Sequence, residues 1–191
     1  MEIGGIDRRS HSGRTEIEKG CDRVFQKGDY VVKANEGICC IEDIVQLDMP
    51  GVSSEEWYYL MIPIKDQNAK LYTLTDNAEN NCRPVITEQD AWSVIDRIPE
   101  IDQAWIGEEK RRETEYKKAI LSNDPTQLIG IIKNIYIRKK GRLEAGKKNT
   151  AVDERYFKMA ENALYQELAF AIGRSKEEIG DIIQDRIGQK E

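Results

Sequence analysis

The sequence is poor in histidine, and this excludes several kinds of chemistry. Its one histidine, His11, lies in a polar stretch near the N-terminus. Ser-His-Asp catalysis, histidine acid–base chemistry and histidine-rich metal sites are therefore nearly excluded. There is also no glycine-rich dinucleotide fingerprint, Walker loop, HExxH, EF-hand loop or nucleophile elbow. We expect no catalytic residue, no cofactor, no metal site and no small-molecule substrate, so a binding or regulatory protein is favoured over an enzyme.

Cysteines are few and are not spaced as metal ligands or as a redox pair. The four are Cys21, Cys39, Cys40 and Cys82, and none forms a CxxC motif. In a strand the adjacent Cys39 and Cys40 would point to opposite faces. We predict buried or half-buried free thiols in a reducing compartment.

Long apolar runs are absent. No stretch approaches the roughly 18 apolar residues that a membrane helix needs, and we expect no membrane partner. Residues 1–23 carry charges throughout and have no apolar core of the kind found in a secretory signal. We interpret them as a disordered leader and expect a cytoplasmic protein.

Charge is unevenly distributed along the chain. The formal net charge is −6, yet residues 105–150 hold 12 basic and 6 acidic residues. A local field decides nucleic-acid binding more than the total charge does. This basic stretch is therefore where a nucleic-acid contact is to be sought, although many solvated helices are equally basic.

Residues 24–86 carry the pattern of strands. Five β-prone stretches follow one another at roughly ten-residue spacing, separated by turn residues. They are Tyr30–Val32, Ile38–Leu47, Trp57–Ile62, Leu71–Leu74 and Arg83–Ile86. We predict five antiparallel strands with no intervening helix, as a small barrel or a strongly bent sheet.

After Thr87 the apolar residues recur at helical spacing. Thr87, Asp124, Thr150 and Ser175 are placed to cap helix N-termini, and a further helix is predicted from near Trp105 to Ser122. The fold class is therefore α+β. We divide the chain into a leader (1–23), a five-stranded β-domain (24–86) and an all-helical domain of about five helices (87–191).

Two details of the helical half are specific enough to test. The helix after Asp124 is predicted to end before a basic connection that spans residues 141–148. Its apolar stripe is expected to face inward, and the stripe consists of Leu128, Ile131, Ile132, Ile135 and Tyr136.

Trp105 is the aromatic residue whose neighbours favour a function. It stands at a predicted helix start, just before Lys110, Arg111 and Arg112. A large aromatic side chain beside a basic face can stack on an unpaired base or wedge into a base step. The alternative is packing against a neighbouring helix as an N-terminal staple.

The basic residues of this half are candidate phosphate contacts. Lys147 and Lys148 precede a capped helix, and a helix N-terminus is a natural phosphate site. Cations at a helix C-terminus, such as Arg138, are also explained by the helix dipole alone. The candidate DNA-binding residues are Trp105, Lys110, Arg111, Arg112, Arg138, Lys139, Arg142, Lys147 and Lys148.

Taken together, the chain resembles the CarD/CdnL family of bacterial transcription regulators. The resemblance begins at the segment FQKGDYVV (residues 25–32), which is similar to the family's F-x-x-G-D-x-V-V, and at the turn of Gly37. It continues through Asp76–Ala78, Arg83–Ile86, Trp105, Ser122–Asp124, Ile135–Arg138 and Glu167–Ala169.

The resemblance implies a Tudor/SH3-like β-domain, shared with transcription-repair coupling factors, that binds the β subunit of RNA polymerase by edge-strand pairing. The implied polymerase-binding residues are Leu47, Leu71, Tyr72, Thr73 and Leu74. Among these, Leu47 and Tyr72 stand where other members often have arginine.

The resemblance also implies a role for the helical domain. It would contact promoter DNA at the upstream edge of the bubble, where Trp105 matches the tryptophan that wedges into the minor groove and hinders bubble closure. The chain is then a regulator that stabilises the promoter open complex. The alternative is a protein–protein adaptor that uses the β-domain on polymerase or another partner and does not bind DNA.

Overall fold

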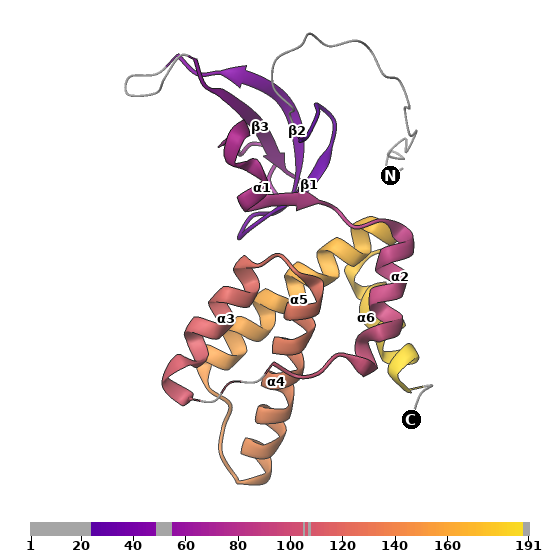
Figure 1. Ribbon diagram of the computed structural model, residues 1–191. Coiled ribbons are helices and arrows are strands. Elements are labelled where there is room, and N and C mark those ends of the chain that lie inside the picture. The colour runs from indigo at the N-terminus through magenta and orange to yellow at the C-terminus, as the bar shows by residue number, and fades with distance from the viewer. Residues whose placement is uncertain (1–23, 49–54, 105, 107, 189–191) are drawn as a thin grey trace.

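The computed structural model describes residues 24–48, 55–104, 106 and 108–188. Strands occupy the N-terminal part, which we call the β-module (residues 24–86), and helices occupy the rest, the helical module (residues 87–188) (Figure 1). The predicted leader, residues 1–23, lies outside the described residues. The α+β class and the order of strands before helices are as predicted.

The β-module contains one antiparallel sheet of five strands. Along the sheet the order is β4-β3-β2-β1-β5. The strands are β1 (Tyr30–Lys33), β2 (Gly37–Gln46), β3 (Trp57–Pro63), β4 (Leu71–Leu74) and β5 (Cys82–Pro84). A register shift between Ile41 and Asp43 interrupts the β2–β3 ladder, and such a bulge bends a strand. The sheet is accordingly the strongly bent one that the sequence predicts.

Alternation along the strands builds the core of the β-module. In β3, Tyr59 and Met61 are fully buried, whereas their neighbours Tyr58, Leu60 and Ile62 are partly exposed. The Tyr59 hydroxyl accepts a hydrogen bond from the Phe25 amide at 3.1 Å. The buried tyrosine hydroxyl is thereby satisfied and ties the chain entry to the sheet.

The prediction that no helix lies between the strands is wrong. A short helical segment, η1 (Thr75–Asn77) followed by α1 (Ala78–Asn81), connects β4 to β5. These two strands are at opposite edges of the sheet, so the connection must cross the module. It coils in doing so and buries Ala78 completely against the core.

The helical module contains five α-helices among the described residues. They are α2 (Glu88–Arg97), α3 (Arg112–Leu121), α4 (Pro125–Glu144), α5 (Ala151–Ile172) and α6 (Lys176–Gly188), with short 3₁₀ turns η2 (Ile98–Glu100) and η3 (Glu109–Arg111). Their apolar faces form a second core, separate from that of the β-module. None of the helices described is long and apolar enough to cross a membrane.

The predicted caps are confirmed. The side chains of Thr87, Asp124 and Thr150 each accept a hydrogen bond from a backbone amide in the first turn of the following helix. Ser175 and Glu178 bond reciprocally, with the Ser175 amide donating at 2.8 Å and its hydroxyl accepting at 3.2 Å. These bonds satisfy amides that would otherwise lack partners at a helix start.

Three details of the helical prediction are wrong. The helix expected to start near Trp105 starts at Arg112, after η3, because the backbone before position 105 bonds to α4 instead. The helix α4 continues to Glu144, since its terminating left-handed residue is Gly146. Tyr136 is 62% exposed, because the inward face runs through Ile135 and the helix turns position 136 away from the core.

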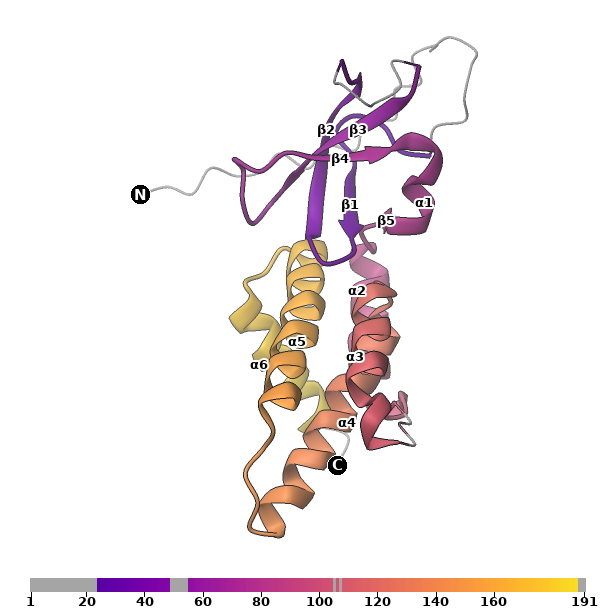
Figure 2. The same cartoon turned by 90° about the vertical axis from the view of Figure 1, so that its left-hand side faces the viewer.

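The two modules meet at the β1–β2 turn. This hairpin turn lies against the C-terminal half of α5 (Figure 2). Gly37 has φ +82° there, and a Cβ on it would lie 2.9 Å from the Gln166 side-chain oxygen. The end of the Gln166 side chain can move aside, but a side chain is strained at this φ, so glycine is favoured at this turn.

Candidate functional site

The first candidate surface is the β4 edge of the sheet. Among the described residues β4 pairs with β3 alone. Its other side therefore presents backbone donors and acceptors to which an incoming strand can pair. Four of the five predicted polymerase-binding residues, Leu71–Leu74, make up this strand.

Side chains of β4 alternate between the two faces of the sheet. Thr73 is buried and accepts a hydrogen bond from Lys33 Nζ at 2.9 Å, and Leu71 packs toward the core. Tyr72 is 45% exposed and lies opposite Leu60 of β3. The side chains of Thr73 and Leu71 point toward the core, so these residues offer mainly backbone groups to an incoming strand. Tyr72 also offers its exposed ring.

Leu47 lies apart from β4. It comes directly after Gln46, the last residue of β2, and Gln46 pairs with Trp57 of β3. The strand β3 therefore separates Leu47 from the β4 edge. The structure groups four of the predicted polymerase contacts on one strand and places the fifth two strands away.

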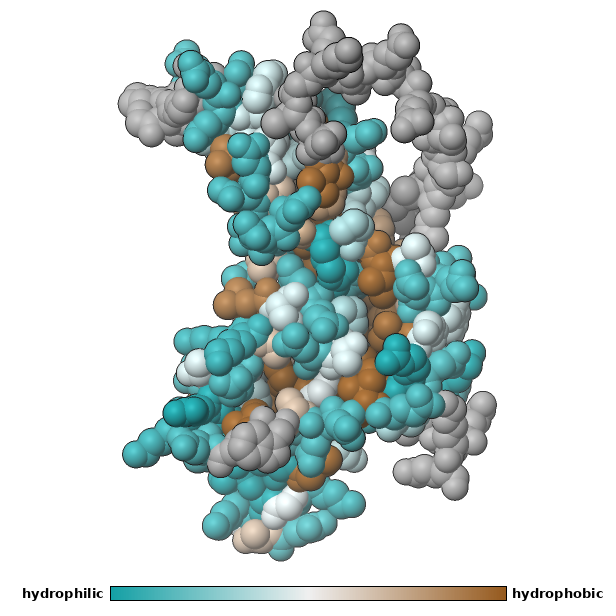
Figure 3. Space-filling model, in the orientation of Figure 1, coloured by the Kyte–Doolittle hydropathy of each residue, from teal (hydrophilic) through white to brown (hydrophobic). Residues whose placement is uncertain are grey.

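The second candidate surface is the end of the helical module that lies away from the β-module. The turn η3 with the start of α3, and the C-terminal end of α4 with its connection to α5, both lie at this end (Figure 1). In the space-filling view its surface is predominantly hydrophilic (Figure 3). Trp105 lies outside the described residues. The described candidate DNA contacts at this end are Lys110, Arg111, Arg112, Arg138, Lys139, Arg142, Lys147 and Lys148.

Two of these cations, Arg112 and Arg138, share a carboxylate partner within the module, the exposed Glu109. Arg112 donates to Glu109 at 3.3 Å, and Arg138 donates to the same carboxylate at 3.0 Å. Arg138 also donates to Asp153 at 2.9 Å. Both guanidinium groups are largely buried, so they hold η3 against α4 as well as adding positive charge.

Asp153 is the buried anchor of this network. Its side chain is fully buried in the first turn of α5 and accepts from the Tyr116 hydroxyl at 3.0 Å. Burial alone would raise the pKa of this carboxyl group, but hydrogen bonds from Thr150, Arg138 and Tyr116 hold the pKa below its usual value. The carboxylate is thus ionised and joins α3, α4 and α5.

Lys147 and Lys148 are exposed in the connection between α4 and α5. The Lys147 amide donates to the Arg142 carbonyl at 2.8 Å, and Arg142 Nε donates to the Lys148 carbonyl at 2.9 Å. These bonds order the backbone while both ammonium groups face outward. The first turn of α5 carries Asp153 and Glu154, so acidic side chains already occupy the helix N-terminus near the predicted phosphate site.

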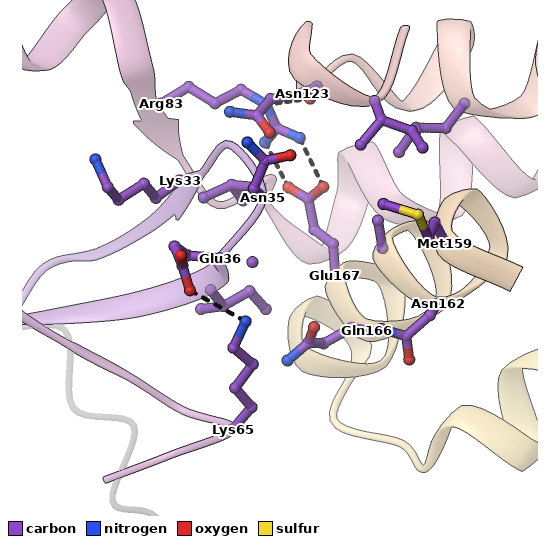
Figure 4. Close-up of a pocket in the computed structure, with 16 residues that line it drawn as sticks. Lys33, Asn35, Glu36, Lys65, Arg83, Asn123, Met159, Asn162, Gln166 and Glu167 are labelled. Carbon is purple, nitrogen blue, oxygen red and sulfur yellow. Dashed lines mark hydrogen bonds and ion pairs between the residues drawn. The ribbon is translucent and has the colours of Figure 1, made fainter. Parts of the chain in front are cut away.

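The junction of the modules contains a small cavity with both polar and apolar lining residues. The hollow has a volume of about 150 Å³ and is lined by β1, the β1–β2 turn, β5, α5 and the α3–α4 turn (Figure 4). Arg83 and Glu167, which both line it, form an ion pair with each other. Arg83 also donates to the Asn123 carbonyl at 2.7 Å.

The thiols of the β-module are free among the described residues. Cys39 is fully buried, and its pKa is raised to about 11, chiefly by burial. Cys40 faces the other side of β2 and is partly exposed, as its position in a strand predicts. Within the described ranges no group of three or more His, Cys, Asp or Glu side chains is placed to hold a metal ion.

Comparison with known families identifies the β-module. Residues 25–86 match the family described as the CarD-like/TRCF RID domain, and the match coincides with the five-stranded sheet. The β-module belongs to this family, which is regulatory and interacts with RNA polymerase. The chain is therefore an RNA polymerase-interacting, transcription-related protein. No curated protein matches the chain.

Several residues that organise these surfaces were not singled out from the sequence. Glu109, Asn134 and Gly130 belong to this group, and each acts through partners far along the chain. Asp153 left a local signal, because it stands three residues after the Thr150 cap in a capping-box position. That position explains its backbone bond but does not predict its partners on α3 and α4.

Proposed function

We propose that this protein binds the β subunit of RNA polymerase through the β4 edge and stabilises the promoter open complex through its helical module. The observation that carries the proposal is the CarD-like/TRCF RID match over a sheet whose β4 strand has an unpaired edge among the described residues. Strand addition supplies main-chain hydrogen bonds, and alternate side chains supply specificity.

The helical module would act on DNA without any covalent change. Exposed lysines and arginines at its far end would contact phosphates, and Trp105 would wedge at the upstream edge of the bubble. A protein that binds the open promoter better than the closed one shifts the equilibrium by that difference in affinity. This role rests on the resemblance together with the basic residues of η3 and of the α4–α5 connection.

The test is the lifetime of the open complex on a promoter with the cognate polymerase. We expect this protein to prolong the lifetime, and we expect Trp105→Ala to remove the effect while polymerase binding and the thermal unfolding midpoint stay unchanged. Trp57→Ala in the β-module is the matched control. At saturating polymerase it should still prolong the open-complex lifetime. An unchanged lifetime with the wild-type protein bound to polymerase would contradict the proposal.

A second candidate is a protein–protein adaptor without DNA contact. It is favoured by one observation: Arg112 and Arg138 are largely buried and bond to Asn134 and Asp153 of the same module. On this hypothesis polymerase binding persists, whereas promoter DNA adds no affinity. Titration of the polymerase–protein complex with and without promoter DNA separates the two functions.

A further inference from the structure

We propose that α4 positions the chain around Trp105 by binding the backbone before that residue and side chains after it. The inference rests on the proposed function, because it concerns how the tryptophan would be presented to DNA. The residues that carry it are Gly130, Lys133, Asn134 and Arg138. Lys133, Asn134 and Arg138 follow Gly130 by three, four and eight positions, so all three lie on the face of α4 that Gly130 marks.

The chain before position 105 is bound to α4 through its backbone. The Ala104 amide donates to the Gly130 carbonyl at 2.8 Å, and the Ala104 carbonyl accepts from Asn134 Nδ2 at 2.8 Å. Lys133 Nζ donates to the Ile101 carbonyl at 2.5 Å. Both polar backbone groups of the residue next to Trp105 are therefore bound to one helix.

The chain after position 105 is bound to the same helix through side chains. Glu109 accepts from Arg138 at 3.0 Å and from Arg112 at 3.3 Å. Arg112 in turn donates to Asn134 Oδ1 at 3.1 Å. The Asn134 amide thus bonds to Ala104 on one side of position 105 and to Arg112 on the other.

Gly130 shows how closely the segment approaches α4. A Cβ at this position would lie 3.3 Å from the Asp102 carbonyl oxygen and 3.4 Å from the Ala104 nitrogen. Glycine in a helix interior lowers helix stability relative to alanine, and the crossing backbone explains its presence here. Gly141 lies on the same helix, and a Cβ there would meet nothing within 4 Å.

This pair of glycines provides a matched experiment. We compare Gly130→Ala with Gly141→Ala in the full chain, measuring amide hydrogen exchange at Ala104 and the open-complex lifetime. A Cβ at position 130 would press on the crossing backbone at 3.3 to 3.4 Å, so Gly130→Ala should weaken the Ala104 hydrogen bond and raise the exchange rate at Ala104 by roughly tenfold. The same variant should shorten the open-complex lifetime, whereas Gly141→Ala should change neither value. Both substitutions favour the helix itself, so exchange at Ala104 reports whether the contact with α4 is loosened, and the open-complex lifetime reports whether that contact matters for function.

Asn134→Ala gives an independent test, with Gln127→Ala as the control because Gln127 is an exposed amide on the same helix. We expect faster exchange at Ala104 and a shorter open-complex lifetime for Asn134→Ala alone. Exchange at Ala104 equal to that of the controls in both test variants would overturn the inference. The inference would also be overturned if the test variants raised exchange at Ala104 but kept the wild-type open-complex lifetime, while Trp105→Ala shortened that lifetime. If Trp105→Ala leaves the lifetime unchanged, the proposed function fails, and the exchange rate still decides whether α4 holds the segment.

Discussion

Arg83 of β5 and Glu167 of α5 form a two-pronged ion pair between the modules, although 84 positions separate them in the chain. The two bonds measure 2.5 and 2.6 Å, and Glu167 is only 3% exposed. The Ile86 amide donates to the same carboxylate at 3.2 Å. The Glu167 carboxylate therefore fixes the end of the β-module against the helical module. It thereby helps to set how the β4 edge is oriented relative to the basic residues at the far end of the helical module.

The first prediction concerns this ion pair. Arg83→Met should lower the free energy of unfolding by about 2 kcal/mol, because it leaves a buried carboxylate without its charged partner. Adding Glu167→Met should recover at least half of that loss, since the uncompensated charge is then gone as well. Urea denaturation measures both values. Arg174→Met removes an exposed Arg–Glu pair and should leave the midpoint unchanged; equal losses for Arg83→Met and Arg174→Met would contradict the prediction.

The second prediction concerns Tyr72. Its ring is exposed on the β4 edge strand, so Tyr72→Glu should weaken binding to an isolated polymerase β-subunit fragment by at least tenfold, because a charge would replace apolar contact area. Titration by fluorescence anisotropy measures this affinity. Tyr136→Glu is the control, since Tyr136 is an exposed tyrosine in the other module. A loss of affinity as large in the control would show that the β4 edge is not the binding surface.

The third prediction concerns Lys147 and Lys148. Reversing both charges to glutamate should reduce the slope of log affinity against log salt by about 1 to 2, because each phosphate contact contributes roughly 0.9 to that slope. DNA titrations at four salt concentrations measure it. Lys27→Glu with Lys65→Glu changes the total charge equally in the β-module and should leave the slope unaltered. Identical slopes for the wild type and both double variants would exclude the phosphate contact.

The fourth prediction concerns acid stability. Because the folded pKa of Asp153 is below its usual value, the unfolded chain takes up a proton first as the pH falls through about 4. The stability contributed by Asp153 is therefore present above about pH 4 and is lost as the pH falls through the folded pKa. Asp153→Asn should be destabilised by about 2 kcal/mol at pH 7 and should show a shallower decline below pH 4.

Urea denaturation of wild type and Asp153→Asn between pH 3 and pH 7 tests this. The pKa of Glu113 is also lowered, chiefly by a hydrogen bond from the Tyr156 hydroxyl, so the difference between the two proteins isolates Asp153. Asp185→Asn, on the exposed side of α6, should follow the wild-type curve. Parallel curves for Asp153→Asn and wild type would contradict the prediction.

Local signals in the sequence were sufficient for most element boundaries. The caps at Thr87, Asp124, Thr150 and Ser175 are bonds between residues at most three apart, and Gly173 adopts the left-handed conformation that ends α5. Alternation and turn residues likewise predicted five strands. Interactions of this kind depend on neighbouring residues alone, so they are readable before any tertiary contact is known.

The structure of the segment from Ile101 to Glu109 could not be predicted from local sequence signals. Its composition predicts a helix from near Trp105, yet the Ala104 carbonyl, which would accept the first bond of such a helix, accepts from Asn134 Nδ2 instead, and the Ala104 amide donates to the Gly130 carbonyl. A partner on another helix satisfies the backbone as well as a helical turn does. The sequence has no local mark for that partner, because Gly130 lies 26 positions further along.

The sequence by itself determined the class of this protein, the strand and helix order, the helix caps and the likeness of residues 25–86 to a polymerase-interacting domain. Only the tertiary structure decided which two strands form the edges of the sheet among the described residues, and which cations face outward. Arg112 and Arg138 look like Lys147 and Lys148 in a list of basic residues, but Asn134 bonds to Arg112 and Asp153 bonds to Arg138, and both arginine side chains are largely buried. Pairing of side chains 15 to 29 positions apart depends on how α3, α4 and α5 pack, and that packing is a property of the whole core.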